Sequence, residues 1–247
     1  MGTFLQLLNI TDRYERKARL LPALIVALPL AIAVGSVVMN MVEWQRALGY
    51  GTLFGGVIGV GLSHFARIPG VWLETKLCKK WQGLPTHRWL RPADTTHSEK
   101  QKSLWRKAIC TITGISLPTK PGNKSEADIN RLINDAVLQL RHRLRNTSMD
   151  SMVNTFNEDY GFARNFAGMR WLWLIFSLIG AGLSYGHLIA FIASVVFVLV
   201  SAVSIFTLPG YVRHCANRYA EALLTTAVTV ADAIKNKKKD CEPVIKS

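Results

Sequence analysis

The chain of 247 residues is 49% hydrophobic and 19% charged, which is close to a soluble domain, so the average composition does not decide its class. The distribution is decisive, because residues 20–39, 47–66 and 171–208 contain no Asp, Glu, Lys or Arg. Uncharged apolar stretches of this length predict membrane-spanning helices. Four cysteines and no recurring period exclude a disulfide scaffold, a coiled coil and a repeat protein.

The first two predicted spans, residues 20–39 and 47–66, form a hairpin after an N-terminal segment of residues 1–19. The second span is rich in glycine, and three of its glycines recur every four residues: Gly51, Gly55 and Gly59. Such a smooth helix face lets a neighbouring backbone approach closely, as membrane helices need in order to associate. The alternative is that a membrane helix simply tolerates glycine.

The third and fourth predicted spans, residues 171–185 and 188–208, form a second hairpin that Pro209 and Gly210 are expected to end. The fourth span carries hydroxyl side chains roughly along one helical face: Ser194, Ser201, Ser204 and Thr207. They are candidates to line or gate a pore. The alternative is that they bond carbonyls of the preceding helical turn and pack.

The orientation follows from the basic residues. Residues 67–170 contain 18 Lys and Arg, whereas Arg46 alone lies on the side of the two short loops. The positive-inside rule therefore places both termini and the central segment in the cytoplasm. We predict an all-α membrane protein with two transmembrane hairpins flanking a mainly helical cytoplasmic insert, plus a C-terminal cytoplasmic helix. Its segments are 1–19, 20–66, 67–170 (basic domain), 171–208, and 209–247 (helix and basic tail).

The central segment is expected to contain one helix near residues 98–113 and another that begins at Ser125. Its basic residues form a candidate surface for an anionic ligand: Arg88, Arg91, Arg106, Lys107, Arg141, Arg143 and Arg145. The last three also fit a second interpretation, in which cations at a helix C-terminus simply match the helix dipole.

No nucleotide-binding glycine loop, metal-ligand spacing or hydrolase motif occurs in the soluble parts, so we predict no enzyme, no metal and no cofactor. An enzyme would have to be built from four residues: His87, Asp94, Glu158 and Asp159.

Two motifs in the central segment resemble a known group of proteins. Residues 81–94, WQGLPTHRWLRPAD, fit a W-x-G-x-P-T-x-x-x-L-R-x-x-D pattern, and residues 160–165, YGFARN, fit Y-G-F-x-R-N. Both are similar to an uncharacterised bacterial family with four transmembrane helices. The layout resembles the membrane effector of Hailong-type anti-phage defence, which implies an oligomeric channel held inactive by an oligonucleotide from an operon-encoded nucleotidyltransferase. Tyr160, Arg164 and Asn165 would then couple the insert to the third span, or alternatively only brace it.

The expected function is a pore-forming effector or ion channel of anti-phage defence by abortive infection. We expect a homo-oligomer, such as a tetramer, in the lipid bilayer. Its pore is expected to be gated by a nucleotide or oligonucleotide that binds the basic domain. The alternative is a non-conducting membrane sensor or scaffold that recruits a soluble partner.

Overall fold

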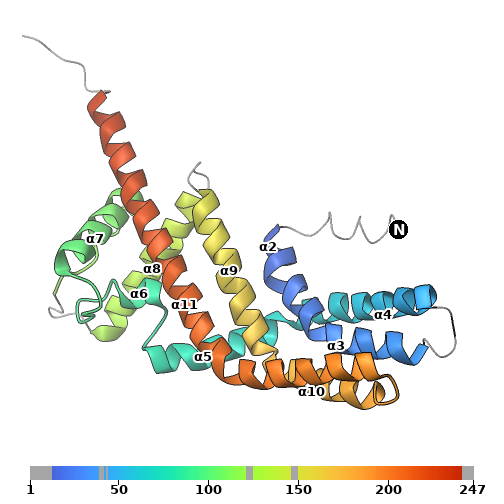
Figure 1. The fold of residues 1–247 in the computed structure, drawn as a ribbon. Helices are drawn as coiled ribbons and strands as arrows, with labels where there is room; N and C mark the ends of the chain where they lie inside the picture. The colour runs from blue at the N-terminus through green and yellow to red at the C-terminus, as the bar shows by residue number, and fades with distance from the viewer. Residues whose placement is uncertain (1–12, 39–41, 43, 121–124, 146–149, 241–247) are drawn as a thin grey trace, which may run out of the picture. The chain divides into compact units, whose positions relative to one another are not determined.

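A computed structural model describes residues 13–38, 42, 44–120, 125–145 and 150–240, and every regular element in this part of the chain is helical (Figure 1). Most of the predicted segment 1–19, parts of the loops near residues 40 and 122, and the end of the basic tail lie outside the described residues. The elements are α2 (Arg13–Glu15), the π-helical turn η1 (Arg16–Leu20), α3 (Leu21–Val38), α4 (Trp44–Phe65), α5 (Arg67–Trp81), α6 (Pro85–Arg88), α7 (Glu99–Thr113), α8 (Glu126–Leu144), α9 (Asp150–Gly168), α10 (Arg170–Leu183) and α11 (Leu188–Asp240).

Two of the described helices are long and apolar enough to cross a membrane, Arg13–Val38 and the stretch Leu188–Lys237 of α11. A third would form if α9 and α10, which meet at a 56° bend, count as one broken span. The glycine-rich α4 is not among them. The helices therefore fit a membrane protein, while the arrangement with four spans stays a prediction.

The described residues form two compact units. The first comprises the residues up to Leu77 together with Glu158–Cys215, and the second comprises Cys78–Asn157 together with the residues from Ala216. Because α9 and α11 pass from one unit into the other, each of these helices contributes to both.

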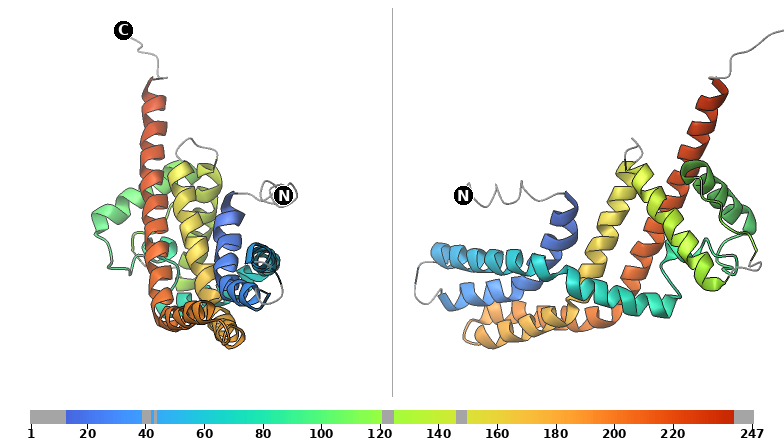
Figure 2. Two further views of the ribbon diagram at one scale, coloured as in Figure 1. Left: turned by 45° about the vertical axis from the view of Figure 1, so that its right-hand side comes forward. Right: turned by 180° about the vertical axis from the view of Figure 1, so that it is seen from behind.

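In the first unit, α3 packs against α4 and α10, and the first part of α11 runs back beside α10 (Figure 2). The glycine face of α4 makes the close approach possible, because a Cβ atom on Gly51 would lie 2.7 Å from the carbonyl oxygen of Ala31. Gly55 and Gly59 meet α3 in the same way, at Ala31 and Leu24. Small residues thus fix the packing of these helices.

The helix α11 continues through Pro209, so the prediction that Pro209 and Gly210 end the second hairpin is wrong. A proline inside a helix removes one backbone hydrogen bond and usually bends the helix. Here the helix does not stop, and the expected C-terminal helix is the second part of α11 rather than a separate element.

In the second unit, the two expected helices are confirmed as α7 and α8. Ser98 caps α7 by accepting a hydrogen bond from the backbone of Gln101, and Gly114 ends it in the left-handed conformation at φ 78°. Ser125 caps α8 by accepting from the backbone of Asp128. The core of this unit includes buried residues from α7, α8 and α11: Ile109, Ile133, Val137, Leu140, Leu223 and Leu224.

Candidate functional site

The W-x-G-x-P-T motif is a tight connection between α5 and α6. Gln82 and Gly83 adopt φ of 61° and 115°, and the amide of Gly83 donates to the carbonyl of Cys78, which closes a Schellman-type helix end. Pro85 then starts α6 at a position where its missing amide hydrogen costs nothing. The motif therefore has a structural explanation in these residues.

Arg88 and Arg91 hold this connection together. Arg88 forms an ion pair with Asp94 at an N–O distance of 3.2 Å. Arg91 donates to the carbonyl of Gln82 at 2.6 Å and to the side chain of Asn130 on α8 at 2.8 Å. Both arginines are half-buried and bonded to internal acceptors, so they are less available to an outside ligand than arginines on an open surface.

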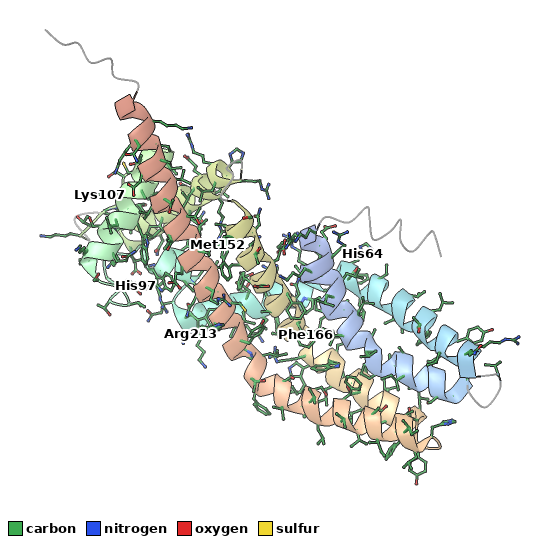
Figure 3. The ribbon with its side chains drawn as sticks, turned by 45° about the horizontal axis from the view of Figure 1, so that its top comes forward. His64, His97, Lys107, Met152, Phe166 and Arg213 are labelled. Atoms are coloured by element: carbon green, nitrogen blue, oxygen red, sulfur yellow. The ribbon has the colours of Figure 1, made fainter. Side chains whose placement is uncertain are left out.

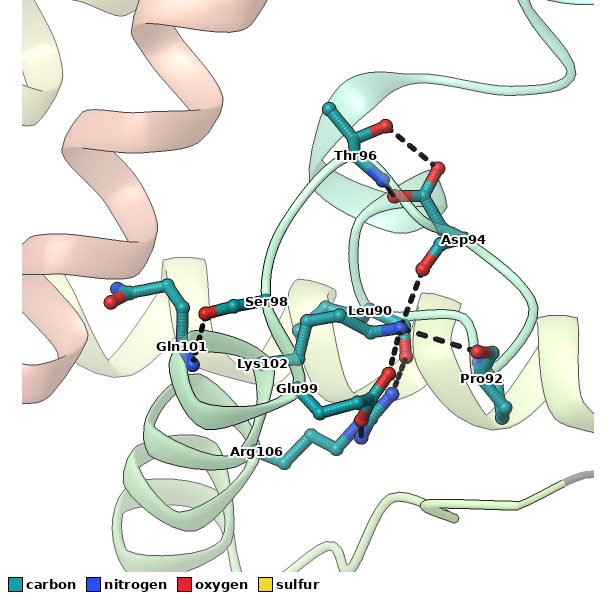
Figure 4. A network of polar contacts seen from close by, with 9 residues as sticks. All are labelled: Leu90, Pro92, Asp94, Thr96, Ser98, Glu99, Gln101, Lys102 and Arg106. Carbon is teal, nitrogen blue, oxygen red and sulfur yellow. Dashed lines mark hydrogen bonds and ion pairs between the residues drawn. The ribbon is translucent and has the colours of Figure 1, made fainter.

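Lys102 is fully buried, which the sequence did not suggest. Its ammonium donates to the carbonyl of Pro92 at 3.2 Å, to the carbonyl of Asp94 at 2.6 Å and to the carboxylate of Glu99 at 2.6 Å (Figure 4). The hydrogen bond from Lys102 holds the pKa of Glu99 below its usual value. A buried charge with several acceptors of this kind is satisfied in place.

Arg106 belongs to the same network. Its guanidinium is 4% exposed and donates to the carbonyl of Leu90 and to Glu99, at 3.3 Å in both cases. Lys107, the next residue of α7, is exposed (Figure 3). Of these two candidate ligand residues, Arg106 is thus committed to internal partners, and Lys107 stands on an outer face.

The structure brings two of the three α8 arginines into one cleft. Arg141 and Arg145 line a cavity of about 320 Å³, whereas the exposed Arg143 does not line it. The other lining residues come from α8, α9 and α11: Leu138, His142, Leu144, Val153, Asn154, Asn157, Tyr219 and Leu223. We call this cavity, with all ten lining residues, the arginine cleft. Its described lining contains no acidic side chain.

Arg141 is the less exposed of the two arginines that line the arginine cleft. Its guanidinium lies 5.3 Å from the ring centre of Tyr219, and it forms no ion pair with any described residue. Its Nε atom is buried and finds no hydrogen-bond partner in the described part of the chain. A partly buried cation without a carboxylate is costly, and an anionic ligand would relieve that cost.

His87 lies close enough to Arg141 to feel its charge. Burial, followed by the charge of Arg141, lowers the pKa of His87 to about 4, although a hydrogen bond with Asn134 opposes the shift. His87 is therefore neutral near pH 7, and the positive charge of this region comes from the arginines.

Four polar residues of the arginine cleft were not predicted as site residues: His142, Asn154, Asn157 and Tyr219. Asn154 and Asn157 are spaced by three on α9, which places them on one helix face, and this spacing was the only local signal. Tyr219 lies in the segment 209–247, which was predicted to form the C-terminal helix. Its place over Arg141 depends on a tertiary contact that the sequence does not encode locally.

The Y-G-F-x-R-N motif forms a polar joint with α5 and η1 in the first unit. Tyr160 and Arg164 both donate to the carboxylate of Glu74, the second at an N–O distance of 2.9 Å. The amide of Asn165 donates to the backbone carbonyl of Ala18 at 2.7 Å. All three predicted coupling residues thus meet here, and the sequence missed the acceptors Glu74 and Ala18.

Three of the four hydroxyl groups predicted to line a pore bond to their own helix. Ser201, Ser204 and Thr207 donate to carbonyls three or four residues earlier, at 3.0, 2.7 and 3.3 Å. Ser194 and Ser201 are completely buried within the single chain, whereas Ser204 is half-buried and Thr207 is exposed. Packing therefore accounts for Ser201, while the buried hydroxyl of Ser194 finds no hydrogen-bond partner among the described residues.

The first unit contains a larger cleft of about 1050 Å³, lined by α3, α4 and the residues from Gly186 to Ala193. Its lining has no Asp, Glu, Lys or Arg side chain, and the hydroxyls of Ser36 and Thr52 donate to carbonyls of their own helices. This cleft does not suit an anionic ligand.

Three of the four residues considered for an enzyme form ion pairs, and the fourth is a partly buried histidine. Asp94 pairs with Arg88, Glu158 with Arg13 and Lys17, and Asp159 with Lys17. His87 is held neutral by its surroundings. Within the described ranges, no three His, Cys, Asp or Glu side chains gather as a metal site would require.

The arginine cleft is therefore the described site whose chemistry points to a ligand, and the polar joint is where the three predicted coupling residues gather. Comparisons with protein-family models, with curated proteins and with solved structures found no match to this chain.

Proposed function

We propose that this protein is a homo-oligomeric pore of the bacterial inner membrane, gated by an anionic nucleotide or oligonucleotide in the arginine cleft. One observation carries the proposal: two walls of the cleft, α9 and α11, are the helices that lead into the apolar segments. A ligand that moves either wall acts on a helix directly connected to a proposed span.

The path along α9 is short. Asn154 and Asn157 line the cleft, and the joint residues Tyr160, Arg164 and Asn165 follow within the next eight positions. The helix then bends by 56° into α10. The ring of Phe166, labelled in Figure 3, packs across this bend against the ring of Trp173, at 5.1 Å between the ring centres. Packed elements of this kind transmit small shifts because they have few alternative arrangements.

The path along α11 is continuous. Tyr219 and Leu223 line the cleft, and the same unbroken helix begins at Leu188 with the most apolar stretch of the chain. We assign the fourth span to residues 188–208 and the third to α10. With α3 and α4 as the first hairpin, this gives four spans and places the arginine cleft in the cytoplasm by the positive-inside rule.

The energetics are adequate for gating. Moving a two-state equilibrium from 1:99 to 99:1 takes about 5.5 kcal/mol of differential affinity. Hydrogen bonds to charged groups contribute about 1.5–3 kcal/mol each, so a few of them in each subunit of an oligomer suffice. The resemblance to Hailong-type effectors supports anti-phage defence as the biological role, with an oligonucleotide that keeps the pore closed.

The test is ion flux from liposomes that contain the full-length protein, with and without a single-stranded oligonucleotide. We expect the oligonucleotide to lower the flux of the wild type and to leave the flux of Arg141→Gln and Arg145→Gln unchanged. Arg143→Gln is the matched control, because it removes the same charge from the same helix outside the cleft. Correctly inserted oligomers that give no flux under any condition would favour the scaffold function instead.

A further inference from the structure

The arginine cleft has the dimensions of a site for one end of a ligand. Its volume of about 320 Å³ is at the small end of the range for ligand pockets. A cavity of this size holds a single group of a polymer and not a length of its backbone, so the charges of its walls decide which group fits best.

The charges of the cleft match a dianion better than a monoanion. Arg141 and Arg145 are four residues apart on α8, which places them one above the other on the same helix face. No acidic side chain in the described lining offsets them, and His87 beside Arg141 is neutral. A terminal phosphomonoester carries a charge of about −1.5 to −2 at pH 7 and offers three acceptor oxygens, whereas an internal phosphodiester carries one charge.

The other walls supply what such a group needs. The side-chain amides of Asn154 and Asn157 are donors on the wall contributed by α9. Tyr219 is only 6% exposed, and its ring faces the Arg141 guanidinium at 5.3 Å, which restricts the rotamers of that arginine. A preorganised guanidinium loses less entropy when it binds phosphate.

We propose that the arginine cleft recognises a terminal phosphomonoester, so that the protein selects ligands by a phosphorylated end and not by their internal backbone. This inference rests on the proposed function only in taking the ligand to be an oligonucleotide. A phosphatidic acid headgroup carries the same chemical group, so the experiment must separate the two sources.

The test is isothermal titration of the full-length protein in nanodiscs of neutral lipid. The probes are a DNA tetranucleotide with a 5′-phosphate, with a 3′-phosphate, and with neither. We expect one phosphorylated form to bind at least about tenfold more tightly than the unphosphorylated form, since two charge-assisted contacts are added. Arg145→Gln changes an exposed side chain, which we expect to leave folding intact, and it should reduce this ratio to about one, whereas Arg143→Gln should preserve it.

Equal affinity of the wild type for all three tetranucleotides would overturn the inference. So would a preference that Arg145→Gln leaves intact. If nanodiscs with phosphatidic acid abolish the binding of the phosphorylated probe to the wild type, the phosphomonoester chemistry holds and its source is the lipid. Binding and flux are separate readouts: selective binding without flux would refute only the pore, and flux that responds equally to all probes would refute only the end recognition.

Discussion

The side-chain amide of Asn165 donates to the backbone carbonyl of Ala18, at 2.7 Å, at a position where the regular α-helical donor is missing. The residue four positions after Ala18 is Pro22, which has no amide hydrogen, and its ring crowds the carbonyl of the preceding turn. The helix widens into η1 at this place, where the amide of Leu21 bonds the carbonyl of Arg16. A side chain from α9 thus completes the first apolar helix.

Replacing Asn165 should expose this dependence. Asn165→Leu leaves the Ala18 carbonyl buried without a donor, which we expect to cost about 1–3 kcal/mol. In a Pro22→Ala background the backbone regains an amide at position 22, so the same change should cost less. Thermal unfolding of the four proteins in nanodiscs gives this double-mutant cycle, and strictly additive effects would contradict the explanation.

The joint should affect gating more than ligand binding. Tyr160→Phe removes the hydroxyl that donates to Glu74 but leaves the ring in place, and neither residue lines the arginine cleft. We expect the oligonucleotide affinity to stay within about twofold of the wild type, since a factor of two is under 0.5 kcal/mol. The change in flux caused by the ligand should fall. An altered affinity with normal gating would assign Tyr160 to the ligand site instead.

The glycine face of α4 offers a matched pair of substitutions. A methyl group on Gly51 would meet the Ala31 carbonyl at 2.7 Å, whereas one on Gly61 would find nothing within 4 Å. Gly51→Ala should therefore lower the stability of the protein in nanodiscs by about 1–3 kcal/mol through overpacking. Gly61→Ala should be neutral or slightly stabilising. Similar effects at both positions would show that helix propensity, and not contact with α3, decides the outcome.

Replacing the buried Lys102 should lower the stability of the protein. Lys102→Met keeps the length of the side chain but leaves the carbonyls of Pro92 and Asp94 without this donor. We expect a loss of about 2–4 kcal/mol in unfolding free energy. The exposed Lys107→Met on the same helix is the control and should stay within about 0.5 kcal/mol of the wild type. Equal losses for the two variants would contradict the assigned role.

The neutral His87 predicts a dependence of stability on pH. Its folded pKa of about 4 lies below the ordinary value of 6.5, so the unfolded chain takes up a proton that the folded chain refuses. The stability contributed at this site is therefore full above pH 6.5 and falls as the pH drops toward 4, by about 3 kcal/mol in total. His87→Gln should flatten the curve of melting temperature against pH in this window, and parallel curves would refute the assignment.

The sequence predicts those parts of the fold that depend on neighbours along the chain. Ser98 and Ser125 mark the starts of α7 and α8 because a cap is a local hydrogen bond. Pro209 misleads, because one missing hydrogen bond does not outweigh the rest of a long helix.

The candidate site depends on contacts that local patterns do not contain. A basic residue on an amphipathic helix has the same pattern whether it meets water, as Lys107 does, or carbonyl oxygens, as Lys102 does. The position of Tyr219 cannot be predicted from local patterns either, since only the fold brings its ring against Arg141, which is far away in the sequence.

The π-helical turn η1 also makes the N-terminal helix tolerant of a change in length. A π-turn holds one residue more than an α-turn, so deleting a single residue between Arg16 and Leu20 would restore regular α-helix. The turns on either side would keep nearly the same orientation about the helix axis, because the π-turn only takes up the extra residue. The contact of Arg13 with Glu158 would therefore survive the deletion. The same deletion inside the regular helix α3 would instead rotate all preceding residues by about 100° around the helix axis.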